Sequence, residues 1–386
     1  MEDIADSMSM RGSPVNTRGG DGPLKESAGL CLSGGGYRAM LFHAGVLWRL
    51  YEVDRLKTLA RVSSVSGGSI TAGMLALRWR RLSFVPANVR TDFEALVVAP
   101  LRELASRTLD ANAVIGGIFL PGTIAEHIAR NYDDALYGGA TLQDLPDDLA
   151  PRFVINATNV QTGSLWRFSR PYMGDWQVGR VLNPTLALST AVAASSAFPP
   201  VLSPLVLNID PSTVQPDPEA PLRRKPYTSR VVLTDGGVYD NLGLETVWKR
   251  YETVFVSDGG QKMAPEPEPH EDWARHSLRI FSLTDNQVRA LRKRQVVGSF
   301  RDKTRKGAYW GIRSLATDFP AATPLACPGQ RTQELAAVPT RLARMDDRLQ
   351  ERLINWGYAV CDLALRSYHE PDLPAPGGFP YPESGV

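Results

Sequence analysis

Four short apolar segments of this chain end in glycine-rich turns, at residues 33–36, 66–68, 235–237 and 258–260. The first two turns are each followed by a segment in which apolar side chains recur at helical spacing, as Met40, Ala44 and Leu47 do. Successive strand–turn–helix units are typical of a parallel β-sheet whose connections are helices. The sequence therefore predicts an α/β fold.

The apolar runs also place the individual elements. Strands are expected at 28–32, 60–65, 152–158, 164–168, 230–234, 253–257 and 278–283. Helices are expected at 37–51, 70–81 and 186–195, and an amphipathic helix should run from Leu342 to Leu363. The expected organisation is a disordered arm over 1–25, a single domain over 26–370 with a helical insertion at about 83–150 and a Pro-rich loop at 199–226, and a Pro/Gly-rich tail over 371–386.

Composition excludes several classes of protein. The 43 Lys and Arg against 41 Asp and Glu argue against a basic nucleic-acid binder. Three scattered cysteines form neither a disulfide framework nor a CxxC metal site, and no metal or cofactor is expected. The sequence shows neither a long apolar run nor a basic-then-apolar secretion signal, which favours a cytoplasmic protein with peripheral membrane contact.

The turn Ser64-Val-Ser-Gly-Gly68 is a candidate nucleophile site. A serine nucleophile must stand exposed on a tight strand-to-helix turn with small residues two positions before and after it, which is the G-x-S-x-G elbow. Ser64 takes the place of the first glycine and is still small, so Ser66 is the candidate nucleophile. A turn that merely caps the following helix is the simpler alternative.

The turn Ser33-Gly-Gly-Gly36 offers backbone N–H groups without obstructing side chains. Gly34, Gly35 and Gly36 could therefore stabilise an oxyanion, and Arg38 could add charge or lock the loop. The same residues match the dinucleotide fingerprint G-x-G-x-x-G/A, with Asp54 twenty residues after Gly34. Asp54, however, precedes the second expected strand, whereas a ribose-binding acid should follow it.

The partner of Ser66 is less obvious. None of the five histidines follows a recognisable strand on a Gly-rich loop, although His127 and His276 stay open as candidates. Asp235 and Asp258 each follow an apolar strand and precede two glycines, so either could bring a carboxylate to the sheet edge near Ser66. An ordinary Asp-Gly turn is the alternative for both.

The motifs SGGGYR at 33–38, SVSGG at 64–68 and DGG at 235–237, in this order, resemble the patatin-like phospholipases. SGGGYRAM is also similar to the catalytic domain of the cytosolic phospholipases A, and segments 156–163 and 193–199 resemble further family motifs. The resemblance covers about residues 28–260. It implies a three-layer α/β/α fold with a mostly parallel central sheet and a Ser–Asp dyad that works without histidine.

Carried over by residue, the resemblance implies Ser66 as nucleophile, Asp235 as base, and Gly34, Gly35 and Gly36 with Arg38 at the oxyanion hole. Asp235 is favoured over Asp258 because Asn241 follows it at the family's spacing. The implied function is a lipid acyl hydrolase acting on phospholipid or other acyl-ester lipids. An acyltransferase or thioesterase using the same dyad is one alternative, and a nucleotide-binding module is another.

Residues 287–306 hold eight Lys or Arg and one Asp among apolar residues. An amphipathic basic helix of this kind favours contact with anionic lipid headgroups. A solvated surface helix is the alternative.

Overall fold

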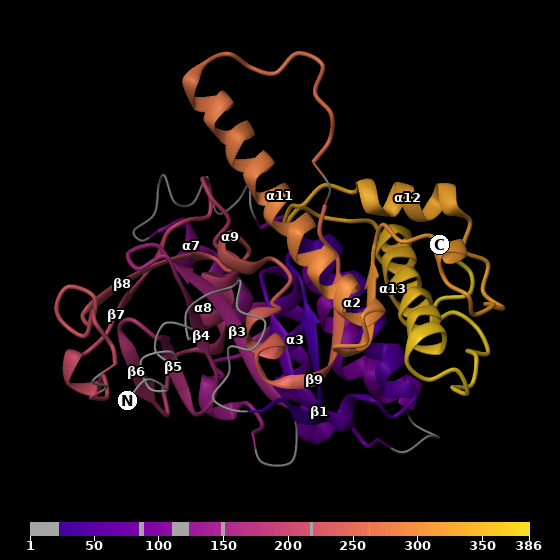
Figure 1. The fold of residues 1–386 in the computed structure, drawn as a ribbon, viewed down its shortest axis with the longest axis horizontal. Helices are drawn as coiled ribbons and strands as arrows, with labels where there is room; N and C mark the ends of the chain where they lie inside the picture. Colours follow the sequence, from indigo (N-terminus) through magenta and orange to yellow (C-terminus); the bar gives the residue numbers. More distant parts are fainter. Residues whose placement is uncertain (1–22, 85–88, 110–122, 148–150, 217–218, 262) are drawn as a thin grey trace.

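A mixed β-sheet of ten strands organises the computed structural model, which describes residues 23–84, 89–109, 123–147, 151–216, 219–261 and 263–386 (Figure 1). Its main path is β10-β9-β1-β2-β3-β4-β5-β6, with β8 also on β3 and β7 on β8. The strands are β1 Lys25–Leu32, β2 Leu59–Ser64, β3 Arg152–Asn159, β4 Ser164–Phe168, β5 Tyr172–Asp175, β6 Gly179–Leu182, β7 Leu205–Asn208, β8 Arg230–Asp235, β9 Tyr251–Asp258 and β10 Lys306–Gly311.

Two strands meet head-on along one edge of β3. β2 pairs parallel with β3 as far as Ser64 opposite Ile155. From Ala157 onward the same edge is occupied by β8, which runs antiparallel to β3 and reaches Asp235 opposite Ala157. The other edge of β3 is taken by β4, so β2 and β8 must share this one. The ends of β2 and β8 are thereby brought together.

Helices cover both faces of the sheet. On one face lie α2 Gly36–Glu52, α3 Gly67–Arg78, α8 Leu188–Ser195 and α13 Asp347–Tyr368, and on the other α9 Gly237–Asp240, α10 Glu245–Trp248 and the second half of α11 Trp273–Arg301 (Figure 1). Side chains alternate accordingly along β1, where Leu30 and Leu32 join the larger apolar core and Cys31 joins the smaller one under α10 and α11. The three-layer α/β prediction is confirmed, but the sheet is mixed rather than mostly parallel, because five of its nine strand pairs are antiparallel.

The remaining helices are α4 Val89–Phe93, α5 Ala99–Ala105, α7 Ile124–Tyr132 and α12 Gly329–Ala337. α4, α5 and α7 belong to the expected insertion at 83–150, of which residues 85–88, 110–122 and 148–150 lie outside the described residues. The expected arm at 1–25 also lies almost wholly outside them, and β1 already begins at Lys25.

The C-terminal helix α13 packs closely along α2. A methyl group at Gly45 would lie 1.9 Å from the carbonyl oxygen of Ile354, and one at Gly357 would lie 1.9 Å from that of Phe42. The two backbones therefore touch where both helices carry glycine. The predicted amphipathic helix is confirmed, although it begins at Asp347 rather than at Leu342.

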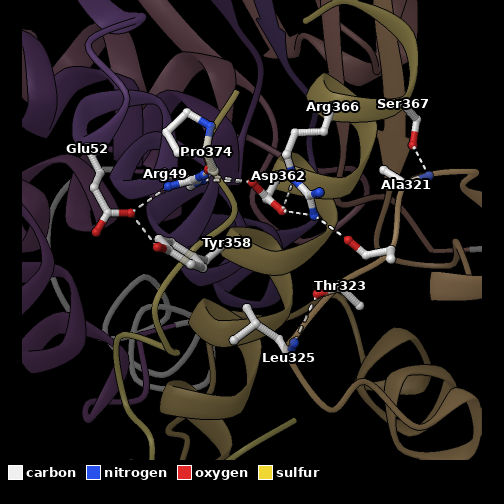
Figure 2. A network of polar contacts seen from close by, with 11 residues as sticks. Arg49, Glu52, Ala321, Thr323, Leu325, Tyr358, Asp362, Arg366, Ser367 and Pro374 are labelled. Atoms are coloured by element: carbon white, nitrogen blue, oxygen red, sulfur yellow. Dashed lines mark hydrogen bonds and ion pairs between the residues drawn. The ribbon is translucent and has the colours of Figure 1, made fainter. Parts of the chain in front are cut away.

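A buried ionic network joins the same two helices (Figure 2). Asp362 on α13 binds Arg49 of α2 at 2.7 Å and Arg366 at 2.8 Å, and its side chain is fully buried. Arg49 also binds Glu52 at 2.9 Å and donates to the carbonyl oxygen of Pro374. This network attaches the last helix and the start of the tail to α2.

Two sequence predictions of strands and loops are wrong. Residues 278–283, expected as the last strand, belong to α11, and the strand at that sheet edge is β10. The Pro-rich segment 199–226, expected to lack regular elements, contains β7, which pairs with β8. Among the helices that the structure describes, none combines the length and apolar character needed to cross a bilayer.

Candidate active site

Ser66 occupies a strained turn between β2 and α3. Its backbone has φ 52° and ψ −122°, a conformation that residues with a side chain rarely adopt. The two residues after it must be glycine, because a Cβ at Gly67 would lie 2.2 Å from the carbonyl oxygen of Gly36 and one at Gly68 would lie 2.6 Å from that of Leu32. The Gly-rich turns after β1 and β2 are therefore in contact, and Ser66, in the second turn, lies next to Gly34 of the first.

Ser195, on α8, holds this turn in place through a hydrogen bond to its backbone. Its hydroxyl accepts the N–H of Ser66 at 2.9 Å and donates to the carbonyl oxygen of Asn156 at 2.7 Å. The bond joins the turn to β3, and it leaves the Ser66 side chain free to face the cavity described below.

Asp235 ends β8 and is 2% exposed. Burial raises the pKa of its carboxyl group to about 7, although the Gly237 N–H and the Ser66 hydroxyl act in the opposite direction. Oδ1 accepts the Gly237 N–H at 2.7 Å, while Oδ2 is buried and makes no hydrogen bond to the residues described. A carboxylate with a pKa near neutrality, next to a serine hydroxyl, has the basicity required of a proton acceptor.

Asp258, the second aspartate that precedes two glycines, has a lowered rather than a raised pKa. Burial would raise the pKa of its carboxyl group, but the Lys293 ammonium and the Tyr309 hydroxyl outweigh burial and lower it to about 2. The Tyr309 hydroxyl donates to Oδ2 at 2.7 Å, and Lys293 forms an ion pair with the same oxygen. Asp258 is thus a paired structural carboxylate and does not line the cavity.

The glycine loop divides its amides between structure and cavity. Gly34 donates its N–H to the carbonyl oxygen of Asn241 at 3.0 Å, so this amide is already used. The N–H groups of Gly35 and Gly36 have no hydrogen-bond acceptor among the residues that the structure describes, and both glycines line the cavity. Gly35 and Gly36 have φ values of 148° and 60°, which favour glycine. Of the three predicted donors, two are available.

Arg38 lies beside the glycine loop, because a Cβ at Gly35 would come 3.0 Å from its Nη2, but it does not line the cavity. Its guanidinium donates to the carbonyl oxygen of Gly259 at 2.9 and 3.1 Å and to that of Val338, and it is fully buried outside the cavity lining. Arg38 therefore ties the start of α2 to the loop after β9. These contacts are of the kind that a lock on the loop would make, and the assignment of Arg38 to the oxyanion hole stays a prediction.

These groups share one cavity of about 950 Å³. Ser66, Asp235 and Gly34–Gly36 lie on its wall, together with the apolar stretch Phe198–Leu202, Val238, Met263, Phe281 and Leu342. None of the five histidines lines it; His43 is buried against Ser33 and Ser257, and burial lowers its pKa to about 4. Asp54 is half-exposed in an ion pair with Lys57, away from the glycines that a nucleotide would occupy.

Comparison with known proteins decides the family. A family model described as patatin-like phospholipase matches residues 30–248, more than half of the chain. The chain belongs to the patatin-like phospholipase family. No curated protein matches it. Within the described residues, no three His, Cys, Asp or Glu side chains of this patatin-like chain come together as metal ligands.

Solved structures give more distant similarities. Human GIVD cytosolic phospholipase A2 in complex with methyl gamma-linolenyl fluorophosphonate has a TM-score of 0.48 at 13% identity, over 94% of this chain and 62% of that one. A second structure of the human enzyme has a TM-score of 0.42 at 15% identity, over 72% and 50%. VipD from Legionella pneumophila has a TM-score of 0.34 at 15% identity, over 88% and 66%. The patatin-like chain thus spans between half and two thirds of their lengths.

The sequence analysis gave no structural role to several residues around the site. The side chain of Asn241 lies among three glycines, because a Cβ at Gly34, Gly237 or Gly260 would come within 3.1 Å of its amide. Ser195 belongs to the family-like segment 193–199, which alone gives it no role. All of the apolar wall at 198–202 except Phe198 lies in the expected loop at 199–226, and Phe281 lies in the wrongly expected strand. Only the spacing of Asn241 after the DGG motif could have indicated one of these residues.

Proposed function

We propose that this protein is a lipid acyl hydrolase in which Ser66 is the nucleophile and Asp235 the general base. The observation that carries the proposal is the head-on meeting of β2 and β8, which sets a strained serine against a buried carboxylate whose pKa is about 7. The surrounding cavity has a largely apolar wall of a size that suits an acyl chain.

The proposed chemistry follows from the geometry. Ionised Asp235 accepts the proton of Ser66 while Oγ bonds to the carbonyl carbon of the ester, and the negative charge moves to the carbonyl oxygen. The N–H groups of Gly35 and Gly36 stabilise that oxyanion. The bond to the alcohol oxygen then breaks, and the alcohol leaves with the proton held by Asp235.

Water completes the cycle by attacking the acyl-enzyme. Asp235 accepts a proton from this water as the water oxygen bonds to the acyl carbon. Asp235 then returns the proton to Ser66 Oγ as the bond to the acyl carbon breaks and the fatty acid leaves. The same acyl-enzyme could transfer its acyl group to another alcohol, which is the acyltransferase alternative. Adding an alcohol acceptor and analysing the products distinguishes the two, because a hydrolase releases mainly free fatty acid.

The test compares the wild type with Ser66→Ala and Asp235→Asn on soluble esters and on a panel of phospholipids. Each variant should lose about 10³-fold or more of kcat/KM. A fluorophosphonate probe should label the wild type and leave Ser66→Ala unlabelled. Asp54→Asn, at the position that a nucleotide site would need, is the matched control and should retain full activity. Labelling or full activity in the Ser66→Ala variant would refute the assignment.

A further inference from the structure

The first half of α11 projects from the body of the protein (Figure 1). All side chains from Trp273 to Thr284 are exposed except that of Arg279, which is partly exposed. Arg279 binds only the preceding loop, at Ala264 and Glu266, and the polar contacts of the helix with the body begin at Arg289, which donates to the carbonyl oxygen of Gln261. Further along, Val296 joins the smaller apolar core. A three-turn helix standing alone in water is marginally stable, so this segment needs a surface that covers it.

The projecting segment is rich in apolar side chains. Trp273 is 83% exposed, and Leu278, Ile280, Phe281 and Leu283 are each 39% to 48% exposed. Large apolar groups gathered in this way mark a binding surface rather than ordinary surface composition.

These side chains continue into the rim of the cavity that holds Ser66. Phe281 lines that cavity, and so do three exposed apolar residues from other parts of the chain, Phe198, Val201 and Val238, which are 53%, 48% and 39% exposed. Exposed apolar groups from three separate segments thus converge on one cavity mouth.

Several basic residues of α11 form ion pairs within the protein, where the sequence analysis expected them to face lipid headgroups. Arg289 pairs with Asp285 at 3.2 Å, Arg292 pairs with Asp240 at 3.4 Å, and Lys293 pairs with Asp258. The first pair lies within α11, whereas the pairs of Arg292 and Lys293 fasten the second half of the helix to the body, so these two basic residues are not free for lipid headgroups. The expected membrane contact at 287–306 stays a prediction that depends on its exposed basic residues, such as Arg294, Arg301 and Lys303.

We propose that residues 273–284, with the apolar cavity rim, insert into the surface of a lipid aggregate, so that an acyl chain can pass directly into the cavity. The inference rests on the proposed function, because a lipid substrate determines the occupant. A second copy or another protein seated on this surface would instead cover the mouth through which the substrate enters.

The test replaces three exposed residues that do not line the cavity, in the variant Leu278→Gln, Ile280→Gln, Leu283→Gln. Glutamine is a good helix former, so the helix itself should persist. The matched control replaces three equally exposed apolar residues elsewhere, Val160→Gln, Trp176→Gln and Leu182→Gln. Pelleting with phosphatidylcholine vesicles measures binding, and a soluble short-chain ester measures the chemistry apart from the interface.

We expect the α11 variant to lose at least about tenfold in vesicle binding and in hydrolysis of vesicle lipid, because it removes apolar area that enters the interface. Its activity on the soluble ester should stay within about twofold of the wild type, since the cavity is unchanged. The control variant should match the wild type in all three measurements. Unchanged vesicle binding in the α11 variant, or an equal loss in the control, would overturn the proposal.

Two further arms separate the competing explanations. The Ser66→Ala variant should bind vesicles as the wild type does, so a failure of hydrolysis can be told from a failure of docking. Binding that requires added phosphatidylserine would overturn the apolar contact and return the role to basic residues. A wild type that is dimeric without lipid, beside a monomeric α11 variant, would show that a second copy covers this surface and would also overturn the proposal.

Discussion

Asp235 and Asp258 begin the same three-residue motif, and their surroundings shift their pKa values in opposite directions. Asp235 is buried without a cation and has a pKa of about 7, whereas Asp258 faces Lys293 and Tyr309 and has a pKa of about 2. The groups that lower the pKa of Asp258, Lys293 and Tyr309, lie more than thirty residues further along the chain. Sequence alone separates the two only through the later Asn241, which the family resemblance supplies.

The raised pKa of Asp235 predicts a pH dependence of activity. The base must be ionised to accept a proton, so kcat/KM should rise with pH and level off with a midpoint near the pKa of about 7. A pH profile on the soluble ester measures it. A profile that is flat between about pH 5 and about pH 9 would contradict the role of this carboxylate as the base.

Ionisation of Asp235, which activity requires, should lower the stability of the folded protein. Between about pH 4 and its folded pKa of about 7, Asp235 keeps a proton in the folded protein that the unfolded chain has released, so the free energy of unfolding falls as pH rises. Asp235→Asn removes this decline. At about pH 8 the inactive variant should be more stable than the wild type, by at most about 4 kcal/mol, and the gap should shrink toward about pH 4. Urea unfolding at both pH values tests the prediction, and a constant difference would contradict it.

At the scale of elements, apolar runs that end in Gly-rich turns predicted β1, β2, β8 and β9 correctly, because a buried strand requires apolar residues on both faces. β10 was missed because Lys306–Gly311 contains two glycines and too few aliphatic residues. Residues 278–283 resemble a strand because they are apolar and short, yet no neighbouring strand is there to pair with them. The shared edge of β3 depends on pairing between distant segments, which no local pattern encodes.

The contact between α2 and α13 yields a prediction at this scale. Gly45→Ala and Gly357→Ala should each lower the free energy of unfolding by about 3 kcal/mol, because the new methyl group would overlap a backbone carbonyl oxygen. Gly298→Ala in α11, where nothing lies within 4 Å, is the control and should stabilise by about 0.5–1 kcal/mol. Thermal or urea unfolding gives all three values, and equal effects would contradict the close packing.

At the scale of the whole molecule, the C-terminal helix α13 is fastened to α2 by the Arg49–Asp362–Arg366 network (Figure 2). Asp362→Asn leaves two arginines without their buried carboxylate and should cost about 3–5 kcal/mol of stability. Asp54→Asn breaks the exposed pair with Lys57 and should cost less than about 1 kcal/mol. Comparing their unfolding free energies checks the prediction, and a similar small loss in both would show that the network contributes little.

The shared edge of β3 also bears on how such a chain can change over time. The sequence between Ser66 and Asp235 includes the segment 198–202 that forms the apolar wall, whereas β3 places the ends of β2 and β8 and Ser195 holds the Ser66 turn. Insertions or deletions at 198–202 can therefore reshape the cavity while the pair that we propose to react stays in place. With this dyad, substrate specificity and chemistry would be inherited separately, and new substrates would be acquired by changing loops alone.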